Sequence, residues 1–474
     1  MPSRSPLRAV LRFCSWCLVL FASGLALSLS GCAAVRSYDT ELYRTLDQAS
    51  AGNVEAAISI LESNNRGPDK DLLYYLELGM LQRLGNRYPE SQKSWMAANR
   101  RLRAWESSVL AAPLDLLRGA SSYLINDKLR AYGGHDYEKV MLLAYGALNH
   151  LALGDYDNAR VAIRQTHELE AVIAELRRRQ LAEVEEDARK RGARTSFKEL
   201  NGYPVETIDN PEVNALKNSY QNALSHYLAG FIYESLGEPS LAAPGYRLAN
   251  ELQPGQPLLE EALRGLDERV SAPDDGLTDV LFVIGAGTAP ALQSRAFQLP
   301  VAVKEKLILL PISFPVIVAT SIPDLPVRLA LSDGQSLSVA PVASIDLMAR
   351  RRLQDDMPGI MLRAAVRSTL SAAMQYQAQQ STDRQNAMMG LAAAVMAGSA
   401  IMETADERIW RTLPAEIFIA RGRLPAGANT VTLHTRQGAR TVRLDLSGRH
   451  AVVDFRLLRQ QLFVQSPRTR EVPR

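Results

Sequence analysis

The spacing of apolar side chains changes once along this chain, near residues 271–276. Before that stretch, apolar residues recur every three or four positions, as in helices that bury one face. After it, segments such as DVLFVIGAG, AEIFIARGRL and HAVVDFRLL are short apolar runs or alternate with polar residues, as in strands. Asp333-Gly334 and Gln437-Gly438 separate partner segments and favour hairpin turns. The pattern predicts an α+β protein.

The two parts differ in their expected architecture. Residues 32–270 are predicted to form a helical domain, and residues 271–474 an antiparallel, sandwich-like β domain. A helical block at 344–403 is inserted in the β domain and contains the apolar, small-residue stretch 387–402. Because that stretch is shorter than the roughly 20 residues that cross a bilayer, a buried core helix or a protein interface is favoured over a membrane element.

The helical part contains an internal repeat. Gly52 and Asn86 lie at equivalent positions 34 residues apart, and the segments 72–99 and 138–166 fit the same frame. The fullest unit is 224–254, with Gly230, Tyr233, Gly237, Ala242, Tyr246, Ala249 and Pro254. These units resemble tetratricopeptide (TPR) repeats, and the resemblance implies an α-solenoid of antiparallel helix pairs held close by small residues. The turn glycine of the 72–99 unit comes one residue early, so its loop is expected to differ.

Two inserts, 100–137 and 167–223, separate the units, and both are predicted to be mostly helical. The second begins with dense mixed charges, which indicate a solvated helix that extends the preceding one and ends at Gly192. Residues 201–213 are rich in Gly, Pro and Asn, and we expect a surface loop that packs across the solenoid.

The first residues carry a targeting signal. Three arginines precede the uncharged apolar core 13–28, a layout typical of a secretory signal peptide over residues 1–31. Leu29-Ser30-Gly31-Cys32 then resembles the bacterial lipobox. That resemblance implies that Cys32 is acylated and becomes the first mature residue, with its acyl chains in outer-membrane lipid. Ala33, rather than Asp, is similar to the outer-membrane sorting pattern and implies a periplasm-facing anchor.

Processing at Cys32 also changes the charge balance. The formal charge of +3 includes the three arginines of residues 1–31, so the mature chain would be neutral. Composition therefore gives no support for a nucleic-acid partner. Cys14 and Cys17 have redox spacing but lie in the removed apolar core, which leaves the exported chain without a cysteine pair for a disulfide.

Cofactor and metal motifs are weak in this sequence. Gly285-Ala286-Gly287 follows a predicted strand, but Pro290 replaces the third glycine of a dinucleotide-binding loop and would interrupt the helix that such a loop needs. The histidines lack the spacing of a structural zinc site. We expect no cofactor and no metal.

The segment 423–433 resembles the PEGA-type turn-and-strand motif of envelope β-sandwich modules.

A polar cluster before the 138–166 unit is the best candidate binding site. Its members are Asn126, Asp127, Tyr132, His135, Asp136, Tyr137 and Glu138. Capping and turn chemistry is the favoured interpretation, with Asp136 capping the helix that follows. The alternative is a site for peptidoglycan or an exported glycan. Further along, Asp406, Arg408 and Trp410 are expected to join a helix to the next strand through a salt bridge and a core tryptophan.

Taken over most of its length, the chain resembles a family of proteobacterial TPR-containing outer-membrane lipoproteins. That resemblance implies a non-enzymatic scaffold or adaptor that presents a concave helical surface to a periplasmic or envelope protein, in cell-envelope or peptidoglycan assembly. Two other roles stay open at this point: a lipoprotein that acts on or binds peptidoglycan or polysaccharide, and a structural subunit of a surface assembly.

Overall fold

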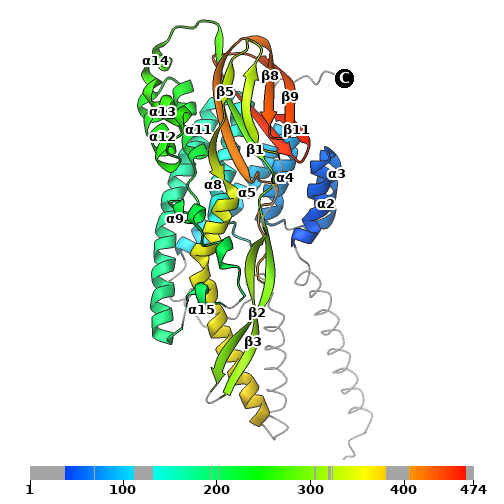
Figure 1. Cartoon of the computed structure of the whole chain (residues 1–474), viewed down its shortest axis with the longest axis vertical. Coiled ribbons are helices and arrows are strands. Elements are labelled where there is room, and N and C mark those ends of the chain that lie inside the picture. The colour runs from blue at the N-terminus through cyan, green and yellow to red at the C-terminus, as the bar shows by residue number, and fades with distance from the viewer. Residues whose placement is uncertain are drawn as a thin grey trace, which may run out of the picture.

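The computed structural model of this chain describes residues 38–68, 70–111, 132–193, 195–200, 202–303, 306–318, 322, 324–380 and 405–465. Within them, helices fill the chain up to Ser271 and strands dominate from Leu277 onward, with one long helix between strands (Figure 1). The predicted α+β class is confirmed. Cys32 and the apolar stretch 387–402 lie outside the described residues.

Antiparallel helix pairs are the building unit of the helical half. In the described residues the pairs are α2 (Tyr38–Ser50) with α3 (Val54–Asn64), α4 (Leu72–Leu84) with α5 (Tyr88–Ala111), α8 (Asp136–Ala152) with α9 (Tyr156–Arg191), and α11 (Ala223–Ser235) with α12 (Pro239–Leu252). Two short helices, α13 (Pro257–Arg264) and α14 (Leu266–Ser271), close this half.

Each of these pairs turns through the same backbone motif. The turn residue has a positive φ, which is 92° at Gly52, 57° at Asn86, 75° at Gly154 and 74° at Gly237. Its N–H bonds the carbonyl three residues earlier, and the next N–H bonds the carbonyl five residues before its own, at 2.8–3.0 Å. This Schellman motif satisfies carbonyls at the end of the first helix. The expectation of a different loop in the 72–99 unit is wrong, because asparagine tolerates the left-handed conformation.

Small residues set the spacing within the pairs, as the TPR-like frame predicted. Gly230 of α11 faces Tyr246 of α12, and a β-carbon at position 230 would lie 2.5 Å from that ring. Gly79 of α4 lies against the indole of Trp95 in the same way. Both aromatic rings are almost fully buried, so the glycines are required for close packing of the helices.

The second insert forms as predicted at its start and differs at its end. Helix α9 runs to Arg191, and Gly192, with a φ of 60°, ends it. The 3₁₀ turns η2 (Phe197–Glu199) and η3 (Val205–Thr207) and the short helix α10 (Pro211–Ala215) follow. The segment 201–213 does not lie across the solenoid. The Tyr203 hydroxyl donates to the carbonyl of Pro315 in a β ribbon, at 3.0 Å.

Two sheets form the sandwich. The five-stranded sheet has the order β11 (Gln461–Gln465), β10 (His450–Leu458), β1 (Leu277–Ala286), β7 (Glu416–Pro425) and β6 (Ala340–Ser344). The four-stranded sheet has the order β5 (Ser336–Ser338), β4 (Pro326–Leu331), β8 (Gly427–Thr435) and β9 (Gly438–Leu446). The hairpin turns predicted at Asp333-Gly334 and Gln437-Gly438 join β4 to β5 and β8 to β9. One expectation is corrected, because β1 pairs with β10 in parallel.

The five-stranded sheet is buried on both faces. Along β1, Val280, Phe282 and Ile284 pack against the four-stranded sheet, whereas Leu281 and Val283 belong to a core shared with the helices. Because side chains alternate between the faces of a strand, the continuous apolar run of β1 is what a central layer requires. The molecule therefore has three layers: helices, the five-stranded sheet and the four-stranded sheet.

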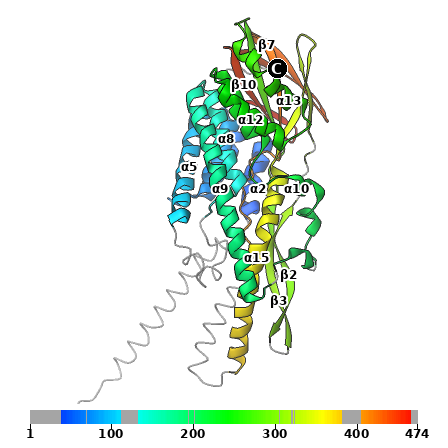
Figure 2. The ribbon, with the colours of Figure 1, turned by 90° about the vertical axis from the view of Figure 1, so that its left-hand side faces the viewer.

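A long arm extends from this body. It consists of the ribbon β2 (Ala291–Val303) with β3 (Lys306–Val318), and of helix α15 (Ile345–Gln380), which lies in the predicted helical insertion. With 36 residues, α15 is about 54 Å long. The ribbon and α15 run side by side next to the end of α9 (Figure 2). Among the described helices, none combines the length and apolar character needed to span a membrane.

Candidate functional site

Three of the first helices, α4, α8 and α11, contact the five-stranded sheet. Every residue of α8 except His150 is buried, and α4 is buried over most of its length. A concave helical surface open to a partner was predicted without naming the helices that form it. In the described residues the chain's own β half lies against α4, α8 and α11, so these helices do not offer an open surface.

Buried carboxylates join two of these helices to the segment before β7. Glu77 of α4 is fully buried and accepts hydrogen bonds from the N–H groups of Arg411, at 2.7 Å, and Thr412, at 3.0 Å. Glu138 of α8 accepts from the N–H of Trp410 at 2.7 Å. Burial raises the pKa of Glu77 above its ordinary value and that of Glu138 to about 7, although these hydrogen bonds favour the ionised forms.

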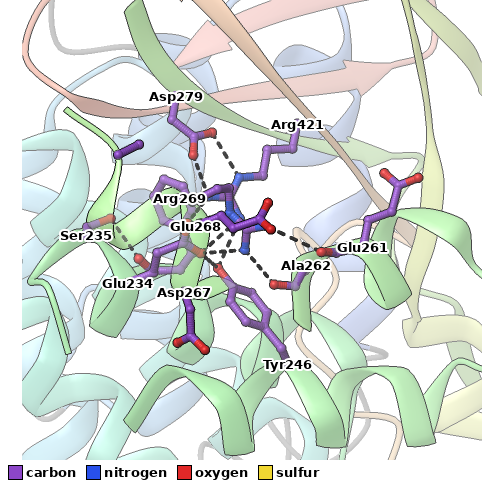
Figure 3. A network of polar contacts seen from close by, with 12 residues as sticks. Glu234, Ser235, Tyr246, Glu261, Ala262, Asp267, Glu268, Arg269, Asp279 and Arg421 are labelled. Atoms are coloured by element: carbon purple, nitrogen blue, oxygen red, sulfur yellow. Dashed lines mark hydrogen bonds and ion pairs between the residues drawn. The ribbon is translucent and has the colours of Figure 1, made fainter. Parts of the chain in front are cut away.

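A third carboxylate connects α11 to the sheet. Glu234 accepts from the guanidinium groups of Arg421 on β7 and Arg269 on α14, each at 2.7 Å, and from the Tyr246 hydroxyl at 2.5 Å (Figure 3). Arg421 also pairs with Asp279 of β1 at 2.5 Å. Burial acts to raise the pKa of Glu234, but the two arginines and the tyrosine outweigh it and lower this pKa to about 2.

Arg83 makes the corresponding contact from α4. Arg83 and Glu234 occupy equivalent places, each three residues before the left-handed turn residue of its hairpin. The Arg83 guanidinium pairs with Asp454 of β10 at 2.9 Å, and the two side chains are 1% and 5% exposed. Arg83 also donates to Asn149 of α8 at 2.5 Å. The same position in two repeats thus carries opposite charges, and each charge is neutralised by the β half.

A cleft of about 240 Å³ lies at the start of α8, between α15, the β2–β3 ribbon and residues 405–409. The ribbon contributes Leu292, Ser313, Pro315 and Ile317 to one wall. The facing wall is a single stripe of α15, with residues three or four positions apart: Ala349, Arg352, Leu353, Asp356, Ile360, Arg363 and Arg367.

The charged side chains of the cleft are mostly cationic. Arg352 pairs with Asp356 of the same helix at 2.5 Å, and Asp356 is shared with Arg177 of α9, also at 2.5 Å. Arg408 pairs with Asp406 at 2.8 Å, the salt bridge that was predicted between these two residues. Trp410 lies in the core, as was also predicted.

Aromatic residues around the start of α8 complete the lining. Tyr132, His135 and Tyr137 all border the cleft. The His135 ring makes a 3.0 Å hydrogen bond through Nε2 to the carbonyl of Arg408, and burial holds its pKa well below the ordinary value, so it is neutral at neutral pH. The Tyr137 hydroxyl is buried and has no hydrogen-bond partner of acceptable geometry among the described residues.

The predicted polar cluster is divided by the structure. Asn126 and Asp127 lie outside the described residues, and Tyr132, His135 and Tyr137 border the cleft. The carboxylates of Asp136 and Glu138 do not line it.

The cap predicted for α8 is also corrected. His135 is the N-cap residue, and the Glu138 carboxylate accepts from its N–H at 2.9 Å. Asp136 instead pairs with Lys139 and Arg177. Although burial opposes them, these cations hold the pKa of Asp136 below its ordinary value.

Several site residues were missed from the sequence. Glu77 and Asp454 stand inside apolar runs, LLYYLELGM and AVVDFRLL, and a charge in such a run is a signal of a buried pair. Arg352, Arg363 and Arg367 share one helical face, which their spacing could have indicated. Within the part of the chain that is described, no group of three or more His, Cys, Asp or Glu residues is placed to hold a metal ion.

The fold and the contacts define an α+β protein whose TPR-like helical hairpins pack on a β-sandwich. No family model matches the chain, and no curated protein matches it significantly. Among solved structures, it is similar to a tetratricopeptide repeat protein from Parabacteroides merdae, at 14% identity and a TM-score of 0.14, over 48% of this chain and 98% of that one. The TPR-like character of the hairpins is seen in their turns and in their glycine-to-aromatic packing.

Proposed function

We propose that this protein is a non-enzymatic scaffold or adaptor of the bacterial envelope. In this proposal the acylated Cys32 anchors it in outer-membrane lipid, facing the periplasm, and the folded body binds an envelope protein, in cell-envelope or peptidoglycan assembly. The lipobox-like residues 29–32 and the repeated helical hairpins support the proposal.

The observation that carries it is the way the two halves are joined. Buried contacts from Glu77, Arg83, Glu138 and Glu234 fix three successive hairpins to the β half. Such a body keeps a constant shape between an anchor and a partner, which is what a scaffold requires. Because the inner helices are covered, the partner is expected on the outer helices.

Helices α9 and α12 offer the surface on which this is tested. Arg160 of α9 pairs at 2.9 Å with Glu238, the N-cap residue of α12. Next to that pair, Val161 is 40% exposed and Leu241 is 52% exposed. On the sandwich, Val327 is 54% exposed and serves as a matched apolar control.

A photoreactive amino acid placed in turn at these three positions tests the proposal in intact cells. Illumination is expected to give a discrete protein adduct from positions 161 and 241, and none from position 327. A protein that reaches the outer membrane and yields no adduct from either helix position would contradict the proposed partner surface. Mass spectrometry of the mature N-terminus tests the anchor separately, and a peptide that begins elsewhere than at an acylated Cys32 would refute it.

The glycan-directed enzyme is not favoured by any contact in the described residues. Its predicted acids, Asp136 and Glu138, are engaged in buried ion pairs and hydrogen bonds and do not line the cleft. Incubation of the purified protein with sacculi remains its direct test. Turnover that is lost in Asp136→Asn and Glu138→Gln proteins, with folding intact, would overturn the scaffold proposal.

A further inference from the structure

The two faces of the β2–β3 ribbon have different neighbours at its base. The residues that border the cleft beside α15 are Leu292, Ser313, Pro315 and Ile317. The register places all four on one face of the ribbon, because residues of a strand alternate between its faces. Phe297 and Phe314 lie on the opposite face by the same rule. The Tyr203 ring packs against both of them, with centroid distances of 5.6 and 6.5 Å.

Toward the far end of the ribbon, the face that carries Phe297 continues with apolar residues only. The register pairs Leu299 with Leu310 and Val301 with Ile308. These four residues, called the apolar face below, follow Phe297 at the two-residue period of a strand. In both views the ribbon runs past the end of α9, and the last turns of α15 lie beside it (Figures 1 and 2). The apolar face therefore belongs to the part of the arm that projects furthest from the body.

The size of this face and the charges next to it indicate what it contacts. A standard protein interface takes about 20–30 residues from each side, so four side chains are too few to hold a second copy of this chain. The hairpin end reads Val303-Lys304-Glu305-Lys306. Lysine next to apolar residues suits a membrane interface, where its stem lies along the lipid and its ammonium group stays in water. A lipid surface therefore fits this face better than a protein does.

The start of the described chain lies at the base of the same ribbon. Arg411 pairs with Asp39 of α2, and it also donates to the carbonyl of Ala289, two residues before β2, at 3.0 Å. Cys32 precedes Asp39 by seven residues, which span at most about 25 Å. The 13 residues of β2 extend about 40 Å from that base. An acyl chain on Cys32 and the apolar face can thus reach one membrane surface.

We propose that the apolar face of the β2–β3 ribbon lies in the membrane interface, in contact with lipid acyl chains. This inference rests on the acyl anchor of the proposed function and adds a second contact with the same bilayer. A single flexible tether leaves the body free to rotate, whereas two separate contacts keep one side of it toward the lipid. Apolar burial and nearby lysines strengthen interfacial binding together.

A fluorophore on a single introduced cysteine tests this placement. Cys14 and Cys17 belong to the predicted signal peptide, and an acylated Cys32 has no free thiol, so the processed protein can be labelled at one chosen position. The label is placed by Val301→Cys or by Ala302→Cys, the adjacent residue on the opposite face. Each labelled protein is reconstituted in vesicles of phosphatidylethanolamine and phosphatidylglycerol, with and without doxyl-labelled lipid. Equal melting temperatures in detergent verify that the labels leave the fold intact.

Quenching by the doxyl lipid is expected at position 301 and to be at least threefold weaker at position 302. Val327→Cys, on the sandwich, serves as a remote control and should show none. Equal quenching at 301 and 302 would overturn the assignment of the face. Emission at 301 that is blue-shifted to the same extent with and without vesicles would show that protein covers the face, and would also overturn it.

Mass spectrometry of the same proteins separates this inference from the acyl anchor. An acylated protein in vesicles without quenching at position 301 would refute the ribbon contact and leave the anchor intact. An N-terminus without acyl chains would refute the anchor. The unacylated protein is then mixed with the same vesicles, and quenching at 301 would still support the ribbon contact, whereas its absence would refute that contact as well.

Discussion

The buried pair of Arg83 and Asp454 gives a sharp test of how the two halves of the molecule are joined. Replacing Arg83 with methionine takes from the buried Asp454 its paired guanidinium, with only the nearby charge of Arg456 left to offset it, and removes a donor from Asn149. Removal of one partner from a buried ion pair costs about 3–5 kcal/mol. Burial already raises the pKa of Asp454, so the lost cation is expected to be felt strongly.

The neighbouring residue Arg87 supplies a matched control in the same hairpin. Its pair with Glu55 spans 3.1 Å, but the two side chains are 37% and 74% exposed. Exposed pairs contribute about 0–1 kcal/mol, so Arg87→Met is expected to change the free energy of unfolding by no more than this. The double variant Arg83→Met, Asp454→Leu removes both buried charges and should recover most of the loss.

Urea unfolding followed by tryptophan fluorescence measures these differences, with Trp95 on α5 and Trp410 next to β7 as buried probes of the two halves. We expect the two probes to report the same midpoint, since they lie in one core. A cost for Arg83→Met no larger than that for Arg87→Met would refute the assigned role of the pair. The role would also be refuted if the double variant lost as much free energy of unfolding as the two single variants lose in sum.

Three further results are expected from the same assay. Gly230→Leu should destabilise the protein by more than 1–3 kcal/mol, roughly the usual range for an overpacked core, because its side chain would overlap the Tyr246 ring; Gly79 offers the parallel experiment. Asn86 has a positive φ, which glycine adopts without strain and alanine does not. Asn86→Gly should therefore be neutral or stabilising, whereas Asn86→Ala should cost about 1 kcal/mol of unfolding free energy. Equal effects of the two changes would contradict the turn assignment. The pKa of Glu138 is raised from 4.5 to about 7, so between these pH values the folded state holds a proton that the unfolded state releases. The free energy of unfolding should therefore fall by up to about 3 kcal/mol as the pH rises through this window. A Glu138→Gln protein with the same pH profile would disprove this.

Local signals explain how much of the fold could be predicted. The 34-residue spacing of Gly52 and Asn86 identifies turns whose geometry depends on a few adjacent residues. Gly192 ends α9 for the same reason, and the alternation in β8 and β9 reflects a face that each strand buries. Such patterns depend on residues of a single helix, strand or turn, so they can be recognised in the sequence.

Contacts between distant segments could not be predicted in this way. Arg83 and Asp454 are 371 residues apart, and nothing near either residue specifies the other. The parallel pairing of β1 with β10 likewise depends on how the whole sheet assembles. The cleft is formed by four separate segments, so only its Tyr132–Tyr137 edge appeared as a cluster in the sequence. Asp136 was assigned as a cap because its partner Arg177, 41 residues later, was not visible from local spacing.

Hydrogen–deuterium exchange of the full chain tests most directly that the inner helices are sealed by the protein's own β half. Amides of α8 and of β10 should exchange at the same slow rate, and both should speed up together in the Arg83→Met protein. Exchange in α8 as fast as in α3, with β10 still protected, would show that the inner helices are free and would contradict the account.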